Sequence, residues 1–271
     1  MTFEGKLVLL GAGKMGGAML QGWLEGGLPA SQIIILDPAP PPETMALIAS
    51  HKISHNPDIA GIDKVAVVLA AVKPQIMDDV LSTVSGLKHH QPLILSIAAG
   101  KTIASFEGHF GADAAVIRSI PNTPAAIGRG ITAIAANANV SESQMALAES
   151  LLSSIGEVVV VDNESLIDAA TAVSGSGPAY VFYLAECLAA AGEAAGLPAD
   201  VAVKLARATV AGAGELMRQS GIEAATLREN VTSPKGTTYA ALQVLMADDG
   251  LRPLMERAVA AAEIRSRELA G

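Results

Sequence analysis

The stretch Gly11-Ala12-Gly13-Lys14-Met15-Gly16 limits the possible folds of this chain more than any other part of the sequence. An apolar run at residues 7–10 precedes it, and Met15, Met19 and Trp23 then recur at helical spacing. In a dinucleotide-binding turn the first glycine allows the tight turn, the second lets the backbone approach a pyrophosphate, and the third lets helix and strand pack closely. The sequence therefore predicts a strand, a phosphate-binding turn and a helix whose N-terminus faces the phosphates.

Further strand and helix patterns continue through the first half of the chain. Apolar runs predict buried strands at residues 33–36, 65–71, 93–97 and 114–120, and a last strand near residues 157–161. Alternation of this kind predicts a parallel sheet wound with helices, in which ligands gather at the carboxyl ends of the strands. The fold class expected is therefore α/β.

Three short stretches follow these strands and are expected to line a cofactor cleft. They are Ala71-Val72-Lys73-Pro74-Gln75, Ser96-Ile97-Ala98-Ala99-Gly100 and Pro121-Asn122-Thr123-Pro124. From them we expect Ala71, Val72, Lys73, Pro74, Ala98 and Asn122 to contact the cofactor, together with Gly11, Gly13, Lys14, Met15 and Gly16. Lys73 is the charged residue of its stretch and faces either a phosphate or solvent.

Asp37 follows the second predicted strand, where an acidic side chain accepts hydrogen bonds from the adenosine ribose and repels a 2′-phosphate. Asp37-Pro38 is also an ordinary turn opening, so the position alone leaves both interpretations open. Residues 30–50 contain no lysine or arginine to meet a 2′-phosphate, although Lys14 could do so. The sequence favours NADH, or the use of both NADH and NADPH.

The pattern changes to helices without strands from Asn163 onward. We therefore predict a dinucleotide-binding domain at residues 1–162 and a helical domain at residues 163–271. Residues 180–195 are apolar except for two glutamates, and a helix that is apolar nearly all round needs more cover than a domain of this size provides. We expect an intertwined dimer, with Cys187 as a small core residue.

Charge and composition exclude several classes of function. The net charge of -9 opposes binding to nucleic acid or an anionic membrane. All five histidines lie in the first half, up to His109, and neither His nor Cys pairs have ligand spacing, so we expect no metal site and no Ser-His-Asp hydrolase. Glycine and proline interrupt the uncharged run at residues 169–185, so we expect no membrane span. Glu4 and Lys6 do not fit a signal peptide, and a cytoplasmic location is expected.

Two stretches of the second half differ from packing sequence. Residues 173–180 open the long helix, with Pro178 suited to its first turn. A second helix is opened by Val231-Thr232-Ser233-Pro234-Lys235-Gly236-Thr237-Thr238-Tyr239. Free N–H groups and hydroxyl donors at a helix start suit a carboxylate, whereas capping needs one hydroxyl and this stretch offers four.

Taken together, these motifs resemble those of the Δ1-pyrroline-5-carboxylate reductases, which reduce a cyclic imine to proline in the last step of proline biosynthesis. The likeness covers essentially all 271 residues and rests on residues 11–16, 71–75, 96–100, 121–125, 174–180 and 231–238. The resemblance implies a Rossmann-like domain that uses NAD(P)H, followed by an all-α domain that interlocks in a homodimer. It also implies dimers that can assemble into a larger ring.

By the same resemblance, the substrate 1-pyrroline-5-carboxylate lies between the nicotinamide and the second helix start, which the partner subunit supplies. Its carboxylate is held by Ser233, Gly236, Thr237 and Thr238. The Val231 carbonyl accepts a hydrogen bond from the ring nitrogen, and Asn56 lies near the adenosine end of the cofactor. The chain departs from the family pattern at Lys235, where a glycine is common, and at Asp37, where many members have neutral or basic groups.

The chemistry implied is hydride transfer to a protonated imine, which needs correct positioning more than a strong general acid. We assign Thr238 the catalytic role of hydrogen-bonding the ring nitrogen, directly or through a water. One alternative is a related dehydrogenase of a small hydroxy or keto acid, but such enzymes place a lysine in the helical domain near the substrate. This chain has no lysine between Lys101 and Lys204. The other is a nucleotide-sensing protein without catalysis, which would not need residues 231–238.

Overall fold

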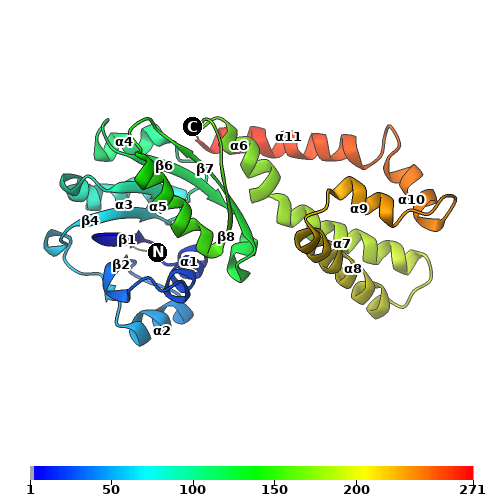
Figure 1. Ribbon diagram of the computed structural model, residues 1–271, viewed down its shortest axis with the longest axis horizontal. Coiled ribbons are helices and arrows are strands. Elements are labelled where there is room, and N and C mark those ends of the chain that lie inside the picture. The colour runs from blue at the N-terminus through cyan, green and yellow to red at the C-terminus, as the bar shows by residue number, and fades with distance from the viewer. Residues whose placement is uncertain (1–2, 271) are drawn as a thin grey trace. The chain divides into compact units, whose positions relative to one another are not determined.

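The computed structural model describes residues 3–270 and divides into two compact units (Figure 1). One unit holds residues up to Gly175 together with the C-terminal stretch from Ala262, and the other is Ser176–Ala261. The break lies beyond the predicted domain boundary after residue 162, because helix α6 (Leu166–Ala170) packs on two strands of the sheet in the first unit.

The first unit is built on an eight-stranded sheet of order β3-β2-β1-β4-β5-β6-β7-β8. The strands are β1 (Lys6–Leu10), β2 (Ile33–Leu36), β3 (Ser54–His55), β4 (Val65–Ala70), β5 (Leu93–Ser96), β6 (Val116–Pro121), β7 (Gly130–Ala136) and β8 (Gly156–Val160). The first six are parallel to one another, which confirms the predicted doubly wound α/β arrangement.

Strand β7 is absent from the sequence prediction, and the expectation of a parallel sheet is wrong at this edge. It runs antiparallel to β6, and β8 is parallel to β7. Only a short 3-10 turn (Thr123–Ile127), followed by Gly128 at φ 65°, joins β6 to β7. Such a connection is too short for the helical crossover that a parallel pair needs, so the chain must reverse.

Helices cover both faces of the sheet because successive strand residues point to opposite sides. Leu7 and Leu9 of β1 enter one apolar cluster, together with residues of α1 (Lys14–Glu25) and α5 (Glu142–Leu152). Val8 and Leu10 enter the other cluster, with residues of α3 (Met77–Val84) and α4 (Ile103–Phe110). Helix α2 (Pro42–His51) completes the unit.

Helix α1 places the glycine turn by packing firmly on the sheet. Its Met19 and Trp23 are fully buried, as their helical spacing predicts, and the Trp23 indole Nε1 donates to the Leu151 carbonyl of α5 at 2.9 Å. Helix α5 begins with a capping box between Ser141 and Gln144. These contacts fix the direction of α1 and hence of its N-terminus.

The second unit is helical. It contains α7 (Gly177–Ala194), α8 (Ala199–Ser220), α9 (Ala224–Asn230), α10 (Thr237–Leu245) and most of α11 (Leu251–Ala270). A π-helical turn, Thr171–Gly175, precedes α7, and Pro178 lies in the first turn of α7 as predicted. Within the described part of the chain, no helix has both the length and the apolarity to cross a membrane.

Helix α7 leaves much of its apolar surface uncovered. Phe182, Tyr183, Leu184 and Leu188 are between 43% and 66% exposed. Cys187 is also exposed in the single chain. The physical reason is that α7 packs chiefly against α8, and only one of its sides is covered in the single chain.

Candidate functional site

The three glycines of the first turn occupy different environments. Gly11 follows β1 and has φ 87°, a conformation that favours glycine, and Gly13 holds the N-cap position of α1. A Cβ on Gly16 would lie 2.3 Å from the Gly11 carbonyl oxygen, whereas a Cβ on Gly13 would meet no atom of the described chain within 4 Å. Gly16 is therefore required for packing, and Gly13 leaves free space above the helix start.

A cleft of about 600 Å³ opens at this turn, at the carboxyl edge of the parallel strands. Seven predicted cofactor residues line it, namely Gly11, Gly13, Asp37, Asn56, Ala71, Val72 and Lys73. The volume lies in the range of sites for small molecules and cofactors. The structure therefore brings together the glycine turn, the end of β2 and the loop after β4.

The other predicted cofactor residues do not line this cleft. Lys14 is exposed in the first turn of α1, Met15 packs against the core, and Gly16 serves the packing described above. Pro74 begins the 3-10 turn that leads into α3. Ala98 and Asn122 are buried in the loops after β5 and β6.

Asp37 joins the glycine turn to the end of β2. Its Oδ2 accepts a hydrogen bond from the Ala12 N–H at 2.6 Å, and its Oδ1 accepts one from the Ala39 N–H at 2.8 Å. Asn56, at φ 48°, donates through Nδ2 to the Asp37 carbonyl at 2.8 Å and accepts from the Asp37 N–H at 3.0 Å. The carboxylate is thus held at the mouth of the cleft, where an adenosine ribose would lie.

One side of the cleft is formed by residues that the sequence analysis missed. Ile76, Val80, Thr83 and Val84 line it from α3 and the turn before it. Counted from Ile76, the other three follow after four, seven and eight residues, which is the spacing of a single helix face. This spacing is the sequence signal from which the wall could have been predicted. Because three of these four side chains are apolar, this wall suits a flat ring such as adenine.

Asn122 uses both ends of its amide within the chain. Its Oδ1 accepts from the Ile131 N–H at 3.0 Å, and its Nδ2 donates to the Ser174 carbonyl at 3.1 Å. It therefore ties the end of β6 to the start of β7 and to the π-helical turn before α7. A π-helical turn within a helix often marks a functional site.

The second helix start, at α10, presents donors that are free to bind an anion. Gly236, which has no side chain, holds the N-cap position, and in the described structure no other side chain caps the helix. The Gly236 N–H donates to the Ser233 carbonyl at 3.0 Å, which closes a turn with Pro234 and Lys235 inside it. A Cβ on Gly236 would lie 2.6 Å from the Ser233 Oγ, which can rotate away, and 3.1 Å from the Ser233 carbonyl oxygen, so a side chain fits here only tightly.

The predicted substrate residues lie together at this helix start in the second unit. Val231, Ser233 and Thr237 are exposed, and Gly236 and Thr238 are half-buried. Uncapped N–H groups at the positive end of a helix, with several hydroxyl groups beside them, can bind a carboxylate. Lys235 has φ 59°, a left-handed conformation that glycine adopts more easily.

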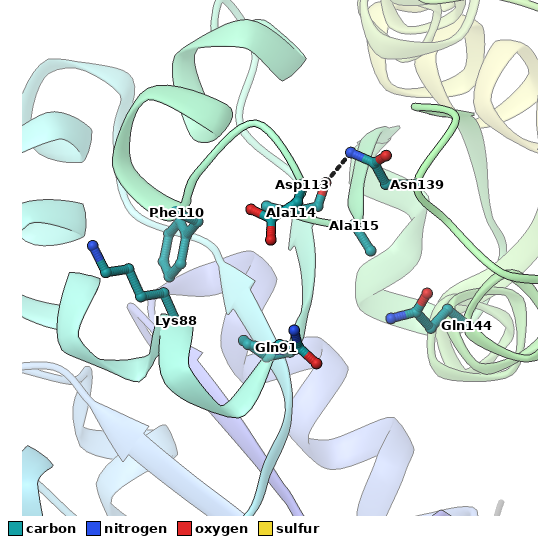
Figure 2. Close-up of a pocket in the computed structure, with 9 residues that line it drawn as sticks. Lys88, Gln91, Phe110, Asp113, Ala114, Ala115, Asn139 and Gln144 are labelled. Carbon is teal, nitrogen blue, oxygen red and sulfur yellow. Dashed lines mark hydrogen bonds between the residues drawn. The ribbon is translucent and has the colours of Figure 1, made fainter.

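A second cavity, of about 330 Å³, lies at the opposite edge of the sheet (Figure 2). Lys88, Gln91 and Asp113 line it just before β5 and β6, and Asn139 and Gln144 line it from the other side. The Asn139 Nδ2 donates to the carbonyl oxygens of the two alanines that flank Asp113. None of the predicted site residues lies here. Among the residues that the structure describes, no group of three or more His, Cys, Asp or Glu is placed to hold a metal ion.

Known proteins resemble this chain over both units. The family model described as "Pyrroline-5-carboxylate reductase dimerisation" matches residues 164–269, and the one described as "NADP oxidoreductase coenzyme F420-dependent" matches residues 6–100. A pyrroline-5-carboxylate reductase of Pseudomonas aeruginosa is 41% identical over 98% of this chain and 97% of its own length.

Two solved structures extend the likeness to the whole fold. A pyrroline-5-carboxylate reductase of Coxiella burnetii superposes with a TM-score of 0.89 at 32% identity, covering 98% of this chain and 99% of its own. The pyrroline carboxylate reductase of Plasmodium falciparum, solved with NADP bound, has a TM-score of 0.80 at 26% identity and 99% coverage of both chains.

Proposed function

The chain belongs to the pyrroline-5-carboxylate reductase family, and we propose that it reduces 1-pyrroline-5-carboxylate to proline with NAD(P)H. One observation carries this assignment: the chain combines an open glycine-turn cleft with an uncapped, hydroxyl-rich helix start, over the full length of its relatives. The cleft suits a dinucleotide, and the helix start suits a small anion.

The first unit fits a nicotinamide dinucleotide. The space above Gly13 and the free N–H groups at the start of α1 suit a pyrophosphate, and the Asp37 carboxylate at the cleft mouth suits a ribose. When bound, the reduced nicotinamide supplies the hydride. We propose that the remaining cofactor contacts come from Lys14, Met15, Gly16, Asn56, Ala71, Val72, Lys73, Pro74, Ala98 and Asn122.

In the second unit, we propose that the start of α10 holds the substrate. The N–H groups and hydroxyls of Ser233, Gly236, Thr237 and Thr238 bind the carboxylate, and the Val231 carbonyl accepts the ring N–H. Thr238 is the catalytic residue that hydrogen-bonds the ring nitrogen. Since the protonated imine is already electrophilic, these residues act by orienting the ring carbon for hydride transfer.

We further propose that the chain acts as a homodimer in which the helix start of the partner subunit completes the site, and that dimers assemble into a ring. The match to the dimerisation model and the exposed apolar face of α7 support self-association. Residues 1–162 then form the cofactor domain and residues 163–271 the dimerisation and substrate domain. The location proposed is the cytoplasm.

Growth of a proline auxotroph tests the proposed activity. The test strain is a bacterium whose own pyrroline-5-carboxylate reductase gene is deleted. When it carries the gene for the present chain, it is expected to grow without added proline. The Thr238→Ala variant is expected to lower kcat/KM for the imine by about 100-fold while leaving cofactor affinity unchanged. Wild-type kcat/KM in this variant would show that Thr238 has no catalytic role.

Replacing Asp37 tests the proposed preference for NADH. Asp37→Ser removes the negative charge from the cleft mouth, so the ratio of kcat/KM for NADPH to that for NADH is expected to rise about tenfold or more. Asp58→Asn is the matched control, because Asp58 is an exposed carboxylate near the same edge that caps only a 3-10 turn. If the ratio is the same in wild type and Asp37→Ser, Asp37 does not select the cofactor.

A further inference from the structure

The loop after β5, residues 97–102, is held in place by the C-terminal end of the chain. Gly100, at φ 72°, lies so close to α11 that a Cβ on it would be 2.7 Å from the Leu269 carbonyl oxygen. Helix α11 begins among the residues of the second unit, but its last turns, from Ala262, belong to the first. The end of this helix thus forms one wall of a loop at the carboxyl edge of the sheet.

A buried polar cluster fastens these last turns. The Ser266 hydroxyl donates to the Asp168 Oδ1 at 2.7 Å, and both residues are buried. Arg118, which is 2% exposed on β6, lies with its guanidinium 3.7 Å from the same Asp168 oxygen. Its Nη1 donates to the Glu164 Oε1 at 3.0 Å. A buried arrangement of this kind has one preferred geometry, because breaking one link leaves a charge without its partner.

The same cluster reaches the other end of the loop. Glu164 Oε1 also accepts from the Ile103 N–H at 2.8 Å, at the first residue of α4. Lys101 pairs with Asp78 of α3 at 2.7 Å, and the Ile97 N–H donates to the Ala70 carbonyl at 3.1 Å. Contacts with β4, α3, Glu164 and α11 therefore hold the loop in place. Among these contacts, the one with Leu269 comes from the C-terminal end of the chain.

The position of this loop in the sheet indicates which part of the cofactor it meets. Asp37, at the end of β2, lies on one side of β1, and the loop after β5 lies on the other side, beyond β4. In doubly wound folds the pyrophosphate binds at the β1 turn, so the adenosine of a bound cofactor would extend toward β2 and its nicotinamide toward β4 and β5. The loop after β5 thus borders the nicotinamide half.

We propose that the last turns of α11 position the nicotinamide ring by supporting the Gly100 loop. Ser266 and Asp168 are positioning residues. Ser266 acts on the loop through the Leu269 carbonyl of its own helix, and Asp168 acts through Arg118 and Glu164. This inference rests on the proposed function only for the identity of the reaction. Glu164, Asp168 and Ser266 all lie within the dimerisation match at residues 164–269.

The test compares the two halves of the cofactor in Ser266→Ala and in a second variant, a full chain shortened to end after Arg267. In both variants kcat for imine reduction is expected to fall about tenfold, since small displacements of a reacting group are costly. The dissociation constant for NADH is expected to rise several-fold. That for ADP-ribose, which lacks the nicotinamide, is expected to stay within about twofold of wild type.

The matched control is Arg265→Ala, which removes an exposed ion pair with Glu268 in the same helical turn and leaves the cluster intact. It should behave as wild type in all three measurements. The inference is overturned if both variants keep kcat within about twofold of wild type, or if ADP-ribose binding weakens as much as NADH binding. The dissociation constants for NADH and ADP-ribose are measured without turnover. Comparing them therefore tests the support of the Gly100 loop by α11 even if the protein does not reduce the imine.

Discussion

At the residue scale, we expect Gly13 to serve cofactor binding and Gly16 to serve folding. Gly13→Ala is expected to raise the dissociation constant for NADH about tenfold or more, because the added methyl group enters the space of the pyrophosphate. Its free energy of unfolding should stay near wild type, since Gly13 has φ -67° and no described atom lies within 4 Å of the new Cβ. Fluorescence titration with NADH and urea unfolding measure the two effects.

Gly16→Ala is the matched comparison in the same turn. Its Cβ would lie 2.3 Å from the Gly11 carbonyl oxygen, so α1 must move away from the sheet. We expect it to lower the free energy of unfolding by roughly 1 to 3 kcal/mol. Equal loss of stability in the two variants, or unchanged NADH binding in Gly13→Ala, would contradict the distinct roles of these glycines.

Lys235 is expected to weaken the folded state. It occupies the third position of the Ser233–Gly236 turn with φ 59°, where a residue with a side chain is strained and glycine is not. Lys235→Gly should raise the free energy of unfolding by roughly 0.5 to 1 kcal/mol, after the larger backbone entropy of unfolded glycine is subtracted. Lys235→Ala, which keeps the strain, is the control for loss of the charge. Urea unfolding in which the glycine variant is the less stable one would contradict this account.

Seven of the residues that line the glycine-turn cleft were predicted from the sequence, but their hydrogen-bond partners were not. The glycine spacing predicted the turn, and the end of β2 predicted the place of Asp37. That Asp37 accepts from the Ala12 N–H, and that Asn56 bonds twice to the Asp37 backbone, depends on tertiary packing that a local pattern does not encode. The cleft wall on α3 was missed, although the helical spacing of its residues could have predicted it.

At the element scale, the ion pair between α3 and the loop after β5 gives a defined pH dependence. The Lys101 ammonium, with a smaller contribution from His109, lowers the pKa of Asp78. Because the folded-state pKa lies below the unfolded one, Asp78 stabilises the fold at neutral pH, and this contribution is lost as the pH falls through the folded-state pKa.

Asp78→Asn tests this sign. The difference in unfolding free energy between wild type and variant should be constant above about pH 5 and shrink below about pH 4. It should not exceed about 1 kcal/mol, since the Asp78 side chain is 58% exposed. Urea unfolding across this pH range measures it, and a difference that stays the same down to pH 3 would contradict the assignment.

Elements with strong periodic patterns could be predicted from the sequence. Elements that depend on how the chain turns back, or on tertiary contacts, could not. The parallel strands β1, β2, β4, β5 and β6 follow from apolar runs, and the capping box of α5 follows from its cap residues. The two-residue strand β3 contains no apolar residue and was not predicted. Strand β7 is rich in alanine and buried along most of its length, so neither β propensity nor alternation marks it. The π-helical turn before α7 likewise depends on tertiary contacts such as the Asn122 bond to Ser174.

At the scale of the whole molecule, the uncovered apolar face of α7 predicts a dimer. A charged side chain introduced on this face should disrupt that dimer. Phe182 is 62% exposed in the single chain, and we propose that a second chain buries it. Phe182→Glu places a charge there twice in each dimer, so the dissociation constant of the dimer should rise at least about 100-fold. Sedimentation equilibrium measures the change.

Glu193→Gln is the control for Phe182→Glu, because it changes the charge of the same helix at a residue that is already polar. It should leave the mass of the assembly unchanged. A Phe182→Glu protein with the mass of the wild-type assembly would show that this face of α7 is not the interface.

The central claim, that the chain is a cyclic imine reductase, is tested most directly by the purified protein with 1-pyrroline-5-carboxylate and either NADH or NADPH. Loss of nicotinamide absorbance and formation of proline are measured together. The account predicts one proline formed for each cofactor oxidised, with kcat/KM for NADH at least equal to that for NADPH. No turnover with either cofactor would contradict it.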